Sequence, residues 1–140
     1  MKIGILLLIS ITYISYVEPF ITTNESRLFD EYGRERIFHG VNIVYKDKPW
    51  YPKLDVFDPQ FSYCDEDMKL LKSWGFNAIR LGVMWPGVEP EYNKYNTTYI
   101  DILHKIVKDS EKYGIYVILD FHQDLLARQF CGEGVPDWVF

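Results

Sequence analysis

Four polar residues lie where two short apolar segments end, and their types suit the binding of a polar substrate. Arg80 lies near the end of the apolar segment 76–81. Asp120, His122 and Asp124 follow the second apolar segment, 115–119, at every other position. Side chains of a strand alternate between its two faces, so these three share one face. An inward arginine is costly unless it is paired, either with Asp120 or with a carboxylate elsewhere in the protein. The group predicts a polar binding site; the alternative is a salt-bridge strut beside a structural histidine.

The same group could in principle hold a metal ion, since histidine and carboxylate side chains are common ligands. His122 and Asp124 are two candidates at a suitable spacing, but two ligands do not make a site and no third is evident. We therefore expect no metal and no cofactor.

The elements that must position these residues read as two repeats of a helix followed by a strand. The first helix signal is a capping pair of Ser62 with Asp65, and the second is Thr98 with Asp101. A glycine closes each helix, and a short apolar strand follows at once. The closing glycines are Gly75 and Gly114, and the strands are expected over 76–81 and 115–119. An earlier strand is expected over 40–44, after a hairpin over 27–39 that turns at Gly33.

Alternation of strands and helices predicts parallel β-α units, which build either a doubly wound sheet or a closed barrel. A dinucleotide-binding sheet needs a glycine-rich turn after its first strand, and residues 44–50 contain no glycine. The barrel is therefore favoured. A (β/α)8 barrel needs about 250 residues. We expect residues 27–140 to be its N-terminal part, with about three β-α units and a truncated C-terminus.

The chain of 140 residues has a net charge of −5 and 48% apolar residues, so it can form a core and is unsuited to nucleic acid. Lys2 and the apolar run 3–14 predict a signal peptide over about 1–17, and hence a secreted protein or one in the secretory pathway or lysosomal lumen. Asn24 and Asn96 begin N-glycosylation sequons. Cys64 and Cys131 could pair in an oxidising compartment, or could each be a small buried residue.

Three separate segments resemble the first three strands of glycoside hydrolase family 5. They are Arg-Ile-Phe-His-Gly-Val-Asn at 36–42, Leu-Leu-Lys-Ser-Trp-Gly-Phe-Asn-Ala-Ile-Arg-Leu at 70–81, and Ile-Leu-Asp-Phe-His-Gln-Asp at 118–124. The last segment, followed by Cys-Gly-Glu-Gly-Val-Pro-Asp-Trp at 131–138, is similar to the endoglycoceramidase branch, as is Gly-Val-Asn-Ile-Val-Tyr-Lys at 40–46. The resemblance extends over residues 27–140.

The resemblance implies a retaining glycosidase with two catalytic glutamates, at the ends of barrel strands 4 and 7. Neither strand is present, so no catalytic residue is assigned in this chain, and the chain alone is expected to be inactive. Arg80 matches the arginine beside the nucleophile, and His122 matches a sugar-contacting histidine. Asp124 and Lys46 match positions suited to sugar hydroxyls.

The branch implies a glycosphingolipid as substrate, cleaved between glycan and ceramide, and contact with a membrane surface through that lipid. Four aromatic residues in expected loops could line its groove or simply pack on neighbours: Trp50, Tyr51, Trp85 and Trp138. The alternatives are a β-glucanase or mannanase of the same family, and a non-catalytic secreted remnant.

Overall fold

The computed structural model describes residues 21–140, so the expected signal peptide lies outside the described residues. These residues belong to two units that meet between Ile37 and Phe38, and each is described by itself. The expected hairpin falls in the first unit, and the expected β-α units fall in the second. None of the helices in residues 21–140 is long and apolar enough to cross a membrane.

The first unit is an antiparallel hairpin of β1 (Ile21–Asn24) and β2 (Arg27–Asp30). The sequence predicted a hairpin over 27–39, which is wrong in its main pairing, because the partner of β2 precedes it. Only one bridge, between Phe29 and Glu35, joins β2 to the residues after the expected turn at Gly33. Strand β1 contains the β-branched residues Ile21, Thr22 and Thr23, which favour an extended strand, so it pairs with β2 over more residues than the segment after Gly33 does.

Buried Asp30 explains why the chain after β2 curls instead of continuing as a strand. Its carboxylate accepts hydrogen bonds from the backbone N–H groups of Tyr32 and Arg34 and forms ion pairs with Arg34 and Arg36 at 2.8 and 3.1 Å. Burial acts to raise the pKa of Asp30, but the hydrogen bonds from the backbone and side chain of Arg34, the backbone hydrogen bond from Tyr32 and the charge of Arg34 together lower it. Charge-assisted hydrogen bonds of this kind are strong, so the carboxylate of Asp30 stabilises the turn formed by the residues that follow β2.

The second unit contains the parallel three-stranded sheet that the sequence predicted. Its order is β3 (Gly40–Ile43), β4 (Ala78–Met84) and β5 (Tyr116–His122), with β4 in the centre. All seven residues of β4 are in register with β5, from Ala78 opposite Tyr116 to Met84 opposite His122. Strands β4 and β5 therefore end together, which brings their polar residues to one edge of the sheet.

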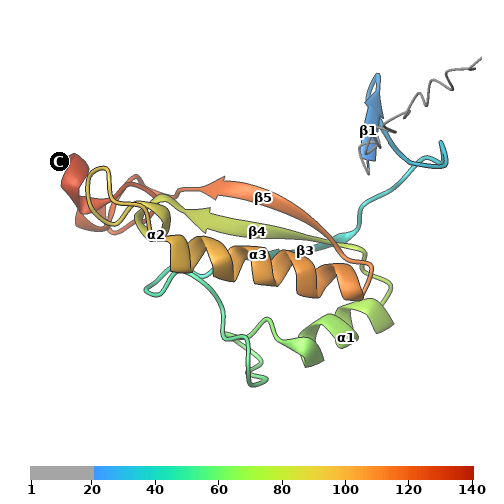
Figure 1. The fold of residues 1–140 in the computed structure, drawn as a ribbon, viewed down its shortest axis with the longest axis horizontal. Coiled ribbons are helices and arrows are strands. Elements are labelled where there is room, and N and C mark those ends of the chain that lie inside the picture. Colours follow the sequence, from blue (N-terminus) through green and yellow to red (C-terminus); the bar gives the residue numbers. More distant parts are fainter. Residues whose placement is uncertain (1–20) are drawn as a thin grey trace, which may run out of the picture. The chain divides into compact units, whose positions relative to one another are not determined.

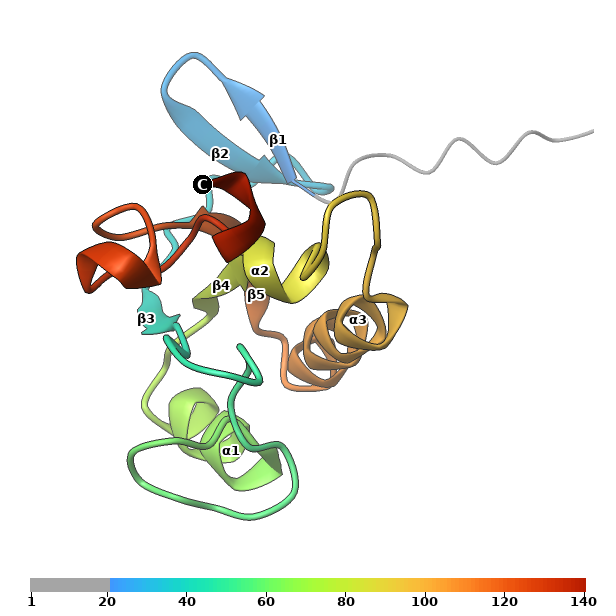
Figure 2. The same cartoon turned by 90° about the vertical axis from the view of Figure 1, so that its left-hand side faces the viewer.

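The helices of residues 21–140 are α1 (Asp65–Ser73), α2 (Trp85–Val88) and α3 (Thr97–Lys112), followed by 3₁₀ turns at Arg128–Phe130 and Asp137–Val139. Two of these three α-helices, α1 and α3, lie where the sequence predicted but begin at other residues, and the short helix α2 was not predicted. Figures 1 and 2 show α1 and α3 on the same side of the sheet.

Both predicted helix caps are wrong by two residues. Helix α1 is capped at Cys64, whose N–H donates to Asp67 at 2.8 Å; the hydroxyl of Ser62 donates to the same carboxylate at 2.6 Å. Helix α3 is capped at Asn96, whose side-chain oxygen accepts from the N–H of Tyr99 at 3.1 Å. Thr98 lies inside the helix, because asparagine is the better cap of the two.

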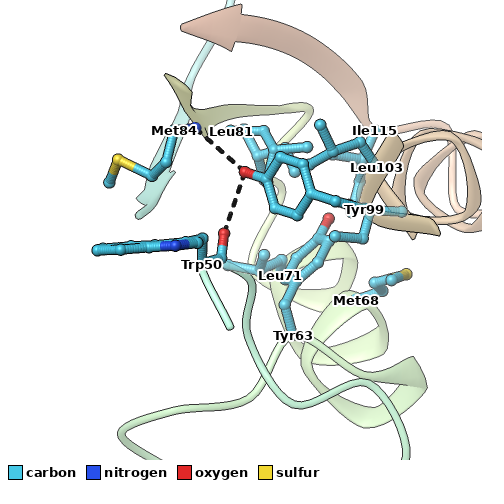
Figure 3. Packing of buried hydrophobic residues seen from close by; sticks show 11 residues of the cluster. Trp50, Tyr63, Met68, Leu71, Leu81, Met84, Tyr99, Leu103 and Ile115 are labelled. Atoms are coloured by element: carbon cyan, nitrogen blue, oxygen red, sulfur yellow. Dashed lines mark hydrogen bonds between the residues drawn. The ribbon is translucent and has the colours of Figure 1, made fainter. Parts of the chain in front are cut away.

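The outer face of the sheet and the helices form the hydrophobic core (Figure 3). Ile79 and Leu81 of β4 are each 1% exposed, as their alternation with Arg80 predicted. Tyr99 at the start of α3 ties the core together: its hydroxyl donates to the carbonyl of Trp50 at 3.2 Å and accepts from the N–H of Met84 at 3.1 Å. Burial raises the pKa of Tyr99, so this hydroxyl stays protonated.

Strand β5 carries apolar side chains that the described residues leave uncovered. On its outer face Leu119 and Phe121 are 61% and 69% exposed, and on its inner face Ile118 is 54% exposed. One edge of β5 pairs with β4, and within residues 21–140 no strand pairs with the other. This is the surface that a further β-α unit covers in a closed barrel.

Candidate functional site

The polar residues predicted from the sequence gather at the carboxyl edge of the sheet. Figure 1 shows α2 and the last residues of the chain at the same end, beyond the tips of β4 and β5. The side chains form two groups, one built on the strands and one built on the loops that follow β3 and β5.

The strand group joins Arg80, Asp120 and His122. The guanidinium of Arg80 lies 2.7 Å from Oδ2 of Asp120, and the same oxygen lies 2.7 Å from Nδ1 of His122. Asp120 is therefore a partner of the inward arginine, as one of the two possibilities from the sequence expected. A carboxylate acts as acceptor only, so Nδ1 of His122 donates and the ring is held in one orientation.

The loop group joins Lys46, Asp124 and Glu133. The ammonium of Lys46 lies 2.8 Å from Oδ2 of Asp124 and 2.9 Å from Oε1 of Glu133. Nε2 of His122 lies 3.8 Å from that same Glu133 oxygen. Glu133 thus connects the two groups into one continuous cluster of charged side chains. The residues expected at the site from the family resemblance all belong to this cluster: Arg80, His122, Asp124 and Lys46.

Glu133 was not predicted from the sequence, although it is the most buried member of the cluster at 8% exposure. Its backbone pairs with Asp124 in both directions, with N–H to carbonyl distances of 2.7 and 2.8 Å. The flanking glycines allow this approach: a Cβ on Gly132 would lie 2.1 Å from the carbonyl of Asp124, and one on Gly134 would lie 2.2 Å from Cβ of Gln123. The Gly-Glu-Gly triplet was the available signal, because glycines mark a close approach of two backbones.

Ion pairing shifts the pKa values of the loop group in the expected directions. The pKa of Lys46 is raised above its ordinary 10.5, chiefly by its contact with Asp124 and next by that with Glu133. The pKa of Asp124 is lowered below its ordinary 3.8 by Lys46. Both partners are therefore charged at neutral pH, and offer donors and acceptors to a polar ligand.

Two of the four aromatic residues expected near the site do lie beside it. The rings of Trp85 and Trp138 meet edge to face, with 5.7 Å between centroids, and each indole N–H donates to Glu89 at 2.9 Å. Phe121 and Tyr92 contact these rings and are exposed. Together these four aromatic rings form an aromatic cluster beside the tips of the strands.

The other two aromatic residues pack into the protein interior. Trp50 is 6% exposed, belongs to the core, and has the guanidinium of Arg128 over its ring at 5.3 Å. Tyr51 packs against Tyr99, with 6.3 Å between ring centroids. A lipid or sugar contact is therefore unsupported for Trp50 in this structure, because its ring is already covered.

The two cysteines are free in the structure, so the disulfide that the sequence allowed is not formed. Cys64 is buried in a pocket shared with Lys105 and Lys112, from the second half of α3. Cys131 is exposed in the loop after β5. Because α3 runs back along the sheet, its second half lies toward the amino ends of the strands, whereas the segment after β5 lies beyond their carboxyl ends (Figure 1).

Both sequon asparagines are exposed, Asn24 at the end of β1 and Asn96 at the cap of α3. In residues 21–140 no three histidine, cysteine or acidic side chains are arranged to hold a metal ion.

Comparison of the sequence with known proteins identifies the family to which the chain belongs. Residues 30–138 match the family model for cellulase (glycosyl hydrolase family 5). The chain belongs to glycoside hydrolase family 5. It is 46% identical over 124 residues to an endoglycoceramidase of Hydra vulgaris, and 47% identical over 119 residues to that of Cyanea nozakii. These matches cover 87% and 85% of this chain and 24% of each relative, so the chain spans about a quarter of the curated relatives it matches.

Solved structures of the family agree with the observed fold. Endo-glycoceramidase II from a Rhodococcus species, in complex with a five-membered iminocyclitol, superposes with a TM-score of 0.65 at 28% identity, over 81% of this chain and 26% of that one. An endogalactoceramidase gives a TM-score of 0.66 at 21% identity, over 86% and 30%. The three parallel strands are thus part of a family 5 (β/α)8 barrel, which confirms the predicted fold class.

Proposed function

We propose that this chain is part of a retaining glycosidase that cleaves glycosphingolipids between the glycan and the ceramide. The observation that carries the proposal is the charged cluster of Arg80, His122, Lys46, Asp124 and Glu133 at the carboxyl edge of a family 5 sheet, where this fold binds its substrates. The endoglycoceramidase names of the similar proteins support the choice of lipid-linked glycans.

The cluster suits a sugar because it offers charged donors and acceptors in fixed positions. Lys46 and Asp124 would bind hydroxyl groups of the first sugar, since charge-assisted hydrogen bonds are the stronger ones. Nε2 of His122 makes no hydrogen bond within residues 21–140 and faces Oε1 of Glu133 at 3.8 Å, and we propose that a substrate hydroxyl group binds to it. Arg80 would stabilise an ionised carboxylate beside it.

The aromatic cluster would meet the lipid or its nearest sugar. Trp85, Phe121 and Trp138 present apolar rings next to polar N–H groups that are already bonded, so their free faces can be buried at little cost. Contact with the membrane surface would follow from the lipid substrate itself. No cofactor is needed for this reaction, which relies on two carboxyl groups about 5 Å apart.

We expect residues 1–140 alone to be inactive, because the resemblance places both catalytic glutamates on later strands. The decisive experiment is to express the protein from the complete gene and supply it with lactosylceramide. Release of intact lactose and ceramide, measured by mass spectrometry, is the expected result.

The same protein should be tested on cellotetraose and on glucosylceramide. Faster hydrolysis of cellotetraose would favour the β-glucanase alternative, for which the cellulase description of the family is the supporting observation. No turnover of any glycoside would favour the non-catalytic alternative. Turnover by residues 1–140 alone would contradict the expected inactivity.

The secretory route is also a proposal, resting on the leader and on the exposure of Asn24 and Asn96. Expressed in animal cells, the protein should lose apparent mass on treatment with an N-glycosidase. Thr98→Ala removes the second sequon and keeps the Asn96 cap of α3, so it should reduce the glycan mass without lowering the thermal midpoint. A protein retained unglycosylated in the cytosol would contradict the proposal.

A further inference from the structure

We infer that Glu133 is a positioning residue, which acts on substrate binding through Lys46 and His122 rather than by touching the substrate. This inference rests on the proposed function and names a residue that the family resemblance did not assign. Three observations support it: the burial of the carboxylate, its place between two site residues, and the rigid backbone that carries it.

The side chain of Glu133 is much more buried than the other two side chains of the loop group. Its side chain is 10% exposed, whereas those of Lys46 and Asp124 are 48% and 55% exposed. A ligand that reaches the cluster from solvent therefore meets Lys46 and Asp124 first. Burying a carboxylate is unfavourable unless it is paired, and the partner of Glu133 is the ammonium of Lys46 at 2.9 Å.

One oxygen of Glu133 faces both site residues. Oε1 lies 2.9 Å from Nζ of Lys46 and 3.8 Å from Nε2 of His122. His122 is fixed from its other side by Asp120, so Glu133 lies at the one ring nitrogen that remains open. A negative charge there holds Lys46 beside Asp124 and at the same time faces Nε2 of His122.

The backbone around Glu133 leaves the side chain little freedom of position. The reciprocal pairing with Asp124 fixes the two residues against each other. The flanking glycines leave no room for side chains, so the segment cannot carry bulkier residues without moving away from Gln123 and Asp124. Groups that orient a binding residue need such support, because small displacements weaken binding.

The test is kinetic and uses the protein expressed from the complete gene, with Glu133→Gln as the variant. The amide keeps the size of the side chain and removes its charge. We expect KM for lactosylceramide to rise and kcat/KM to fall by about 10- to 100-fold, the range typical of residues that orient binding groups. Glu66→Gln is the matched control, since Glu66 is exposed in the first turn of α1 and takes part in none of these contacts, so this change should leave both constants unchanged.

A double-mutant cycle separates positioning from a merely structural role. If Glu133 acts chiefly through Lys46, then Glu133→Gln should have much less effect on kcat/KM in a Lys46→Ala background than alone. Equal effects in both backgrounds, or a wild-type kcat/KM in the single variant, would overturn the inference. A fall in thermal midpoint matched by proportional losses of activity on all substrates would also overturn it.

A measurement without turnover keeps the inference distinct from the proposed function. In NMR spectra the Nζ signal of Lys46 should be visible in the wild type, because the ammonium is held by two carboxylates, and should broaden in Glu133→Gln. An unchanged signal would overturn the inference whatever the activity. An inactive wild type would contradict the proposed function alone.

Discussion

At the scale of single residues, the site depends on carboxylates that each serve two partners. Asp120 joins Arg80 to His122, and Glu133 lies between Lys46 and His122. Alternation along the strands was enough to predict Arg80, Asp120 and His122. Glu133 escaped prediction because it reaches the site through the loop after β5, and no strand or helix period governs a loop.

Asp120→Asn should weaken the site without unfolding the protein. The amide keeps the shape but leaves Arg80 without a charged partner, and it replaces the carboxylate that orients His122 with a weaker, neutral acceptor. We expect kcat/KM on lactosylceramide to fall by about 100-fold, because even a small displacement of a group that positions the substrate can cost that much. Asp101→Asn on the exposed face of α3 is the control, and an equal loss in both variants would contradict this role.

The ion pair of Lys46 and Asp124 should persist over a wide pH range. Because the pKa of Asp124 is lowered, its contribution is present above 3.8 and is lost as pH falls through the folded pKa. Because the pKa of Lys46 is raised, its contribution is present below 10.5 and is lost as pH rises through the folded pKa. Titration followed by NMR should show no change in either group between these limits. A transition of either group near neutral pH would contradict the pairing.

At the scale of elements, the sequence predicted which strands and helices exist better than where they begin. The two closing glycines lie at positive φ, 83° for Gly75 and 66° for Gly114, as a helix end requires. Helix α2 was missed because Pro86 and Gly87 indicate a loop, although proline is tolerated in a first turn. The caps were missed because competing hydroxyl residues lay within two positions of the true ones.

Gly40 shows how one position fixes the spacing of two elements. A Cβ there would lie 1.8 Å from the carbonyl oxygen of Ala78, its partner in β4. Gly40→Ala should therefore push β3 away from β4 and lower the thermal midpoint by several degrees, since it strains a strand pair. Gly33→Ala is a contrasting variant: its Cβ meets nothing within 4 Å, and its cost comes from its positive φ alone. A stable Gly40→Ala protein would contradict the close approach.

Tyr99→Phe should measure the link between α3, the Trp50 loop and the end of β4. It leaves the carbonyl of Trp50 and the N–H of Met84 without their partner in the core (Figure 3). A buried group left unpaired costs about 1–3 kcal/mol. Urea unfolding should show that loss, and Tyr95→Phe on the exposed loop should show almost none. A loss of stability shared by both variants would argue against the link.

At the scale of the whole molecule, the described residues form part of a family 5 sheet in which two strands are covered by helices and the third is largely uncovered. Strands β3 and β4 are covered by α1 and α3, whereas β5 exposes apolar residues on both faces. An exposed apolar edge strand favours association. Residues 1–140 expressed alone should therefore elute from a sizing column as aggregates, and a monodisperse monomer would contradict this expectation.

The central position of β4 also sets how slowly its amides should exchange with solvent. It is bonded along its length on one side to β5 and over four residues on the other to β3, and its outer side chains lie under helices. Hydrogen exchange of a core strand requires large-scale opening, while an edge strand needs only local fraying. Deuterium should enter the β1–β2 hairpin and the free edge of β5 first and the middle of β4 last, so the strand that carries Arg80 would be the last to open.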